Sequence, residues 1–147
     1  MSVPVALDEL ATALAARANA AYLLTVGDDG RVHCVASTVR WREDELVVPA
    51  GATSVRNATA RGSVVLLSPP AQGLPSSRTG SSLDAYSLIV DAEVTGCSSA
   101  DGPGGGPGTA VHVRPAHAVF HRPAPGSGTG EVGHDCVHVY EEATPRD

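Results

Sequence analysis

Lysine is absent from this chain, and its absence limits what the protein can bind. All ten basic residues are arginines, against sixteen Asp and Glu, so the formal net charge is −6 at neutral pH. Binding to the phosphates of DNA or RNA needs a basic stripe that displaces counterions, and the sequence has none. The same shortage of positive charge argues against an anionic membrane surface as a partner.

Long apolar runs and a disulfide framework are missing as well. Apolar stretches such as Val64–Leu67 fall far below the ~20 residues that a membrane span needs. The N-terminus has no basic and apolar leader, so no secretory signal is expected. Cys34, Cys97 and Cys136 are odd in number and widely spaced, which does not fit a disulfide framework. A cytoplasmic, reduced chain without a nucleic-acid or membrane partner is therefore expected.

Aromatic residues make up only 3% of the chain, so its core must be built from Val, Leu and Ala. A length of 147 residues predicts a single domain over residues 1–147. A domain of this size buries about 70% of the surface that its unfolded chain exposes. The 16 glycines and 11 prolines predict many turns and argue against an all-helical bundle.

A helix is predicted over Pro4–Asn19, because apolar side chains recur there at helical spacing. Ser2 is able to cap its start, and Pro4 suits a first helical turn. The apolar residues form one stripe along the helix, namely Leu7, Leu10, Ala11, Leu14, Ala15 and Ala18. An amphipathic helix of this kind packs against a sheet.

From Ala20 onward the apolar period changes to two, which is typical of strands. A short helix that stops at Gly62 is predicted over Ser54–Arg61. The predicted strands are Tyr22–Val26, Val32–Trp41, Leu46–Val48, Val64–Leu67, Ala85–Thr95, Val111–Arg122 and Cys136–Tyr140. Loops are expected over residues 69–82 and 96–108, and a frayed tail over residues 141–147. The order favours a mainly β fold with helices, an antiparallel barrel.

One segment combines several features that attract phosphate. A predicted strand ends at Val48 and Pro49, the small residues Ala50 and Gly51 follow, and a helix begins with Thr53, Ser54 and Arg56. Free amides and the dipole at a helix N-terminus attract anions, hydroxyls add donors, and arginine supplies a fork suited to phosphate oxygens. The alternative interpretation is that Thr53 or Ser54 is a helix cap and Arg56 a solvated charge.

Other motifs are less informative or absent. Arg40 and Arg42 share one face of a strand, so both could reach one anion, or they are exposed charges balanced by Glu43–Glu45. The sequence has no Gly-x-Ser-x-Gly elbow of a serine hydrolase and no Gly-Lys-Ser/Thr of a P-loop. No pair of carboxylates is placed for acid–base catalysis.

Histidines offer a second kind of site. His134, Cys136 and His138 would share one face of the last predicted strand, as would His117 and His121 on the strand before it. Imidazole and thiolate on one face are able to bind zinc or another transition metal. The spacing matches no closed structural zinc pattern, so a barrel face or a dimer seam lined by histidine is the favoured interpretation.

Taken in order, these segments resemble the pyridoxamine 5′-phosphate oxidase-like flavin-binding split-barrel family. The run Ala21–His33, AYLLTVGDDGRVH, resembles the first hairpin of that family. Ser54–Asn57 falls where the family has a phosphate cradle, with Arg56 in place of the more common lysine. The strands that match are Val64–Leu67, Leu88–Val94 and Val111–Arg122, so the resemblance covers residues 5–122.

The resemblance implies a six-stranded split barrel that forms a homodimer and binds FMN or a deazaflavin between its subunits. The cofactor phosphate would lie near Arg40, Ser54 and Arg56, and its ring near the backbone of Val48–Gly51. Because such a cofactor carries the chemistry, the implied reaction is hydride transfer between the ring and a small organic substrate.

The resemblance is incomplete at the C-terminus. The chain lacks the Trp and Arg cluster with which true pyridoxamine phosphate oxidases hold their substrate, so oxidation of pyridoxamine phosphate is not expected. The alternative is a non-catalytic module of the same fold that carries a cofactor, or that holds heme through His117 or His121.

Overall fold

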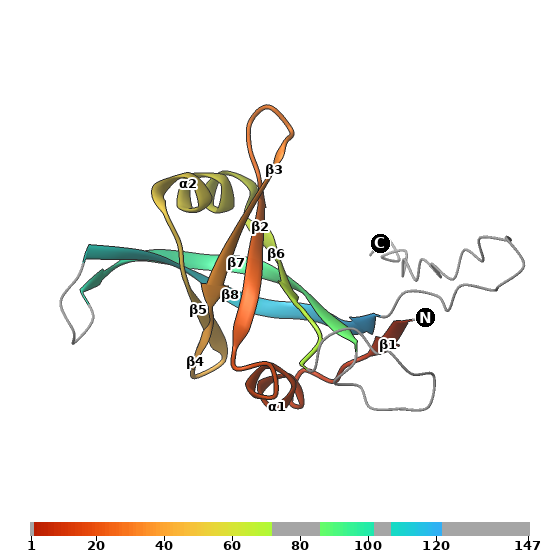
Figure 1. The fold of residues 1–147 in the computed structure, drawn as a ribbon. Helices are drawn as coiled ribbons and strands as arrows, with labels where there is room; N and C mark the ends of the chain where they lie inside the picture. The colour runs from red at the N-terminus through yellow and green to blue at the C-terminus, as the bar shows by residue number, and fades with distance from the viewer. Residues whose placement is uncertain (1, 72–85, 102–106, 122–147) are drawn as a thin grey trace, which may run out of the picture.

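The computed structural model describes residues 2–71, 86–101 and 107–121. Strands dominate this part of the chain, with two helices between them (Figure 1). The elements are β1 (Ser2–Pro4), α1 (Leu10–Ala15), β2 (Ala20–Val26), β3 (Val32–Thr38), β4 (Arg40–Arg42), β5 (Glu45–Pro49), α2 (Ala52–Arg61), β6 (Ser63–Ser68), β7 (Ser87–Asp101) and β8 (Pro107–His121). Neither helix of the described residues is long and apolar enough to cross a membrane.

The strands form one antiparallel sheet in the order β3-β2-β6-β7-β8-β5-β4, and β1 pairs with β8. β3 and β4 lie at opposite ends of this order, although only Val39 separates them in the sequence. The two edges must therefore come together, and the sheet curls into a half-barrel (Figure 1). Val39 is fully buried at this junction, and its amide donates to the Asn19 carbonyl at 2.8 Å.

Side-chain contacts rather than a backbone ladder join β3 to β5 within the described residues. The Ser37 hydroxyl donates to the Pro49 carbonyl at 2.8 Å across this seam. Without a ladder, the barrel stays split between the two strands.

The interior of the half-barrel is aliphatic, as the low aromatic content predicts. Alternate residues of each strand point inward, and the largest fully buried side chains include Leu23, Leu46, Leu66, Leu88, Val48, Val90, Val111 and Val113. The opposite positions form an outer apolar face on β2, β3, β6 and β7, made by Tyr22, Leu24, Val26, Val32, Val65, Leu67 and Ile89.

The two helices lie at opposite ends of the barrel (Figure 1). α2 begins after Gly51 and ends at Gly62, whose φ of 73° is readily adopted by glycine and whose amide donates to the Ala58 carbonyl. Ser54, Asn57 and Ala58 form its buried side. The sequence prediction of a short helix that stops at Gly62 is confirmed, with a start two residues earlier.

The N-terminal helix is shorter than Pro4–Asn19, and this prediction is wrong at both ends. Ser2–Pro4 pairs with β8, and the Val5 amide donates to the Ala118 carbonyl, so the sheet holds the backbone that a helix would have used. Ala18 and Asn19 have positive φ values, which end the helix. Much of the predicted stripe is alanine, and alanine burial supplies too little free energy to hold four turns on the sheet.

The strand predictions differ from the structure mainly in number and length. The described residues form eight strands rather than six, because Ser2–Pro4 adds one and the predicted strand Val32–Trp41 is divided at Val39. β7 and β8 extend to Asp101 and from Pro107, into the loop predicted over residues 96–108. The predicted strand Cys136–Tyr140 and tail 141–147 lie outside the described residues, as does most of the predicted loop 69–82.

Arg17 connects the end of α1 to the sheet from a buried position. Its guanidinium donates to the carbonyls of Ala13 at 2.9 Å and Tyr86 at 2.8 Å, and it lies 5.1 Å from the centre of the Phe120 ring. A charged donor held by two carbonyls and an aromatic face couples three elements that are distant in sequence.

We expect Arg17→Ala to lower the free energy of unfolding by about 3 kcal/mol, because hydrogen bonds to charged groups each contribute about 1.5–3 kcal/mol. Urea unfolding followed by circular dichroism measures the loss. Arg42→Ala is the matched control, since Arg42 is exposed and its loss should change stability by less than about 0.5 kcal/mol. Equal effects of the two substitutions would contradict this account of Arg17.

Candidate functional site

A cavity of about 470 Å³ lies between the β2–β3 turn and α2. The turn and the start of β3 contribute one wall, and the first half of α2 contributes the other. The lining residues are Gly27, Asp28, Asp29, Arg31, Val32, His33, Thr53, Arg56 and Asn57. The cavity therefore lies between the first hairpin and the helix for which the sequence predicts phosphate binding.

Two hydrogen bonds hold the helix against the hairpin and fix the distance between these walls. Asn57 Nδ2 donates to Thr25 Oγ1 at 3.3 Å, and both side chains are buried. Arg61 donates to the Gly27 carbonyl at 3.0 Å. A Cβ at Gly27 would lie 3.0 Å from Asp29 Oδ1 of the same turn and 3.9 Å from Asn57 Nδ2 of α2.

The turn itself is closed by its own backbone. The Gly27 amide donates to the Arg31 carbonyl at 2.9 Å, and Gly30 adopts a φ of 76° that glycine readily permits. Asp29 accepts the Arg31 amide at 3.0 Å, and its carboxylate also lies 3.7 Å from the Arg31 guanidinium. The negative charge of Asp29 is thus partly offset within the turn.

The α2 wall is positively polarised. Arg56 is exposed and forms no ion pair with any acidic side chain that the structure describes. Val55 is the first α2 residue whose amide donates to the residue four before it, the Gly51 carbonyl at 3.0 Å. The amides of residues 52–54 therefore precede the helical ladder, and with the Thr53 hydroxyl and Arg56 they supply donors that suit a phosphate.

The structure brings together two of the eight residues that the sequence assigned to cofactor binding. Thr53 and Arg56 line the cavity. The other six residues do not line it. Gly51 precedes α2, and Pro49 and Ala50 each have a backbone group hydrogen-bonded to another strand. Arg40 is exposed on β4, Val48 is in the core and Ser54 is buried.

The burial of Ser54 is the least expected of these placements. Its side chain is 1% exposed, and its hydroxyl is buried without a hydrogen-bond partner among the described residues. The predicted contact between Ser54 and a phosphate stays a prediction, as do those of Arg40 and of the ring with Val48–Gly51.

Asn57, Arg31 and His33 line the cavity but were not assigned to the site from the sequence. The sequence feature that could have identified Asn57 is the Ser-Val-Arg-Asn motif, of which it is the last residue. The contribution of the hairpin residues depends on how the turn meets α2, which sequence spacing does not reveal.

The predicted histidine sites are only partly described. His117 Nδ1 lies 3.4 Å from Asp91 Oδ2, and His121 Nδ1 lies 3.2 Å from the Ser2 hydroxyl. Residues 134–138 fall outside the described part of the chain. Within the described ranges no group of three or more His, Cys, Asp or Glu could hold a metal ion.

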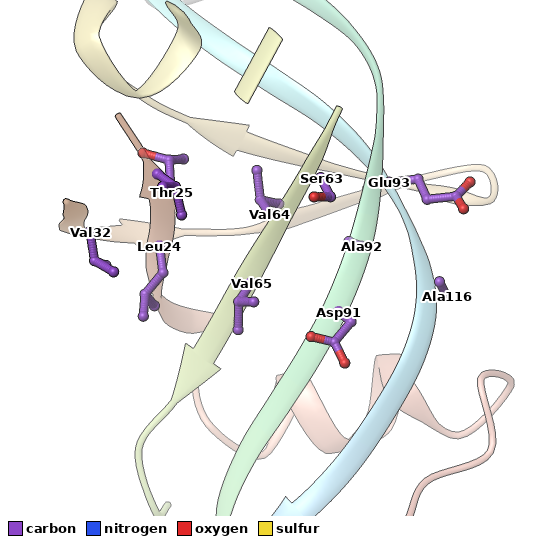
Figure 2. A pocket seen from close by; sticks show the side chains of 11 residues that line it. Leu24, Thr25, Val32, Ser63, Val64, Val65, Asp91, Ala92, Glu93 and Ala116 are labelled. Carbon is purple, nitrogen blue, oxygen red and sulfur yellow. The ribbon is translucent and has the colours of Figure 1, made fainter. Parts of the chain in front are cut away.

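A second cavity of about 390 Å³ lies over β2, β6 and β7 (Figure 2). Leu24, Val32 and Val65 of the outer apolar face contribute to its lining, and β7 adds the carboxylates of Asp91 and Glu93. Its apolar floor marks the outer face as a surface on which another molecule could pack.

Solved structures place this architecture in a known class: the chain has the split-barrel fold of pyridoxamine 5′-phosphate oxidase-like proteins. One similar structure, an F420 reductase, covers 72% of this chain and 93% of its own, with a TM-score of 0.52 and 19% identity. A candidate pyridoxamine 5′-phosphate oxidase from Listeria innocua covers 75% and 95%, with a TM-score of 0.51 and 12% identity.

HutZ, a heme storage protein from Vibrio cholerae, covers 75% of this chain and 92% of its own, with a TM-score of 0.50 and 14% identity. No protein family and no curated protein matches the sequence. At these identities the likeness concerns the fold, which an F420 reductase and a heme storage protein share.

We expect Asn57→Ala to loosen the junction between α2 and the hairpin and to lower the free energy of unfolding by about 1–3 kcal/mol. The reason is that the buried Thr25 hydroxyl loses the donor that the structure provides for it. Chemical denaturation measures the change. Thr53→Ala, on the exposed side of the same helix, should leave stability nearly unchanged, and an equal loss in both variants would contradict the assignment.

Proposed function

We propose that this chain is a cytoplasmic oxidoreductase that binds FMN or a related deazaflavin in the cavity between α2 and the β2–β3 turn. The observation that carries the proposal is Arg56, which forms no ion pair within the described ranges, beside Thr53 and the first-turn amides of α2, which precede the helical ladder. This donor set fits a phosphate group, because it joins a full positive charge to hydroxyl and amide donors.

The segment between β5 and α2 would position the cofactor ring. The Pro49 carbonyl accepts the Ser37 hydroxyl, the Ala50 amide donates to the Thr109 carbonyl at 2.9 Å, and the Ala50 carbonyl accepts the Thr109 hydroxyl. These bonds make the segment rigid before any ligand binds. A rigid wall lowers the entropy that binding must remove.

A flavin or deazaflavin, when bound, supplies the hydride chemistry. The chain's own part is to hold the phosphate through Thr53 and Arg56 and to keep one wall of the ring site fixed. The substrate would be a small organic molecule that approaches the exposed side of the ring.

The outer apolar face supports a homodimer, which the same proposal includes. Val32 is 62% exposed, Tyr22 43% and Val26 40%. The strand register aligns Tyr22 with Leu67 and Leu24 with Val65, so these apolar side chains lie side by side on one surface. Contiguous exposed apolar surface of this kind is typical of protein–protein contacts.

Titration of the purified protein with FMN and with the deazaflavin F420 tests the cofactor. We expect one of them to bind, and Arg56→Ala to weaken that binding by about 10- to 150-fold, the equivalent of one charge-assisted hydrogen bond. Arg42→Ala, which removes an exposed arginine away from the cavity, should bind like the wild type. Failure of the wild type to bind either compound, or binding of heme with a Soret band instead, would overturn the proposal.

Sedimentation of charged variants tests the homodimer. Val32→Glu and Val26→Glu each place a carboxylate on the outer apolar face, where burial of an unpaired charge is costly. We expect each to shift the protein from dimer to monomer. Leu7→Glu is the control, because Leu7 is also exposed but lies before α1. A wild type that sediments as a monomer would refute this part of the proposal.

A further inference from the structure

A serine, a histidine and a glutamate form a chain of polar contacts across three neighbouring strands. Ser98 Oγ on β7 lies 2.8 Å from His112 Nε2 on β8. His112 Nδ1 in turn lies 3.7 Å from Glu45 Oε2 on β5. The other Glu45 oxygen lies 3.8 Å from the Arg114 guanidinium, which helps to hold the carboxylate in place.

The sheet register explains why these side chains meet. His112 is paired with Val47 on one side and with Gly96 on the other, and Ser98 is paired with Ala110. Since paired residues of antiparallel strands share a face, Ser98 and His112 lie diagonally on the same side of the sheet. Gly96 carries no side chain opposite His112, and a Cβ there would meet no atom within 4 Å.

The chemistry of the three groups sets the direction of the hydrogen bond between Ser98 and His112. An ionised glutamate only accepts, so the imidazole proton belongs on Nδ1, which faces Glu45. Nε2 is then an acceptor, and the Ser98 hydroxyl donates to it. The side chains of His112 and Glu45 are only 16% and 25% exposed, so water competes weakly for these contacts.

This arrangement has the relation of nucleophile, base and orienting acid that activates serine in hydrolases of unrelated folds. We propose that Ser98 is an activated nucleophile that cleaves activated acyl esters, with His112 as its general base and Glu45 as a positioning residue. No cofactor takes part, so this second activity is independent of flavin binding. Ser98 lies within strand β7 rather than at a Gly-x-Ser-x-Gly elbow.

In the acylation step the Ser98 oxygen forms a bond to the ester carbonyl carbon, and its proton moves to His112 Nε2. The bond from that carbon to the leaving oxygen breaks, and the leaving alcohol takes the proton from Nε2. Water then attacks the acyl-serine in the same way, which releases the acid and restores the hydroxyl. No oxidant or reductant is needed.

Arg40 supplies positive charge on the same face. It is paired with Val47, which is itself paired with His112, so Arg40 lies two strands from the histidine. Neighbouring strands are about 4.8 Å apart, and Ser98 lies one strand further away than His112. Arg40 therefore adds positive charge to the surroundings of the site without reaching Ser98.

A fluorophosphonate probe, which labels activated serines with loss of fluoride, tests the proposal on the full chain. We expect one label for each chain, and mass spectrometry of the digested protein should map it to Ser98. His112→Gln should slow labelling by about 100-fold or more, the usual contribution of a general base. A burst of nitrophenol from p-nitrophenyl acetate should accompany labelling of the wild type.

Controls separate activation from a structural role. Ser63→Ala removes an exposed serine elsewhere on the barrel and should label like the wild type, whereas Ser98→Ala should not be labelled. Glu45→Gln should slow labelling, because it removes the carboxylate that orients His112. Glu45→Asp keeps a carboxylate and should restore part of the rate, a difference that a merely structural role for Glu45 would not produce. An unlabelled Ser98 in the wild type, or His112→Gln that reacts at the wild-type rate, would overturn the proposal whether or not the protein binds a flavin.

Discussion

The continuity of the chain through Val39 is the constraint on which the rest of the structure depends. β3 and β4 lie at the two ends of the strand order, yet one buried residue connects them. An open, gently twisted sheet could not satisfy this connection, so the sheet has to curl until its edges meet. The curl creates an aliphatic interior and brings β3 beside β5, where the Ser37 hydroxyl bridges the seam.

The same curl positions the candidate cofactor site. It carries the β2–β3 turn to the end of the barrel that α2 covers, and the buried bond between Asn57 and Thr25 holds the two together. Asn57 and Arg61 join the walls at this end, and Thr53 and Arg56 face the cavity. Because the walls are preformed, an anionic ligand would meet donors that already have fixed positions.

The two faces of the sheet have different chemistry because side chains alternate along each strand. The inner face is filled by leucine and valine, which leaves the outer face free to vary without loss of the core. On that face one region is apolar and another carries Ser98, His112 and Glu45. A fold of this kind does not dictate one activity, since separate sites can be built on separate parts of its surface.

Local pattern in the sequence determined much of the secondary structure. Period-two alternation located the strands of the barrel, Gly62 marked the end of α2, and the ordered motifs indicated the split barrel. The same pattern overestimated the first helix, because a stripe of alanine imitates a helix while the pairing of Ser2–Pro4 with β8 depends on residues more than a hundred positions away. Thr53 and Arg56 could be assigned to a phosphate site because they belong to one continuous motif in the sequence. The hairpin wall of the cavity, the burial of Ser54 and the contacts of His112 with Ser98 and Glu45 depend on strand register and barrel closure, which only the tertiary structure decided.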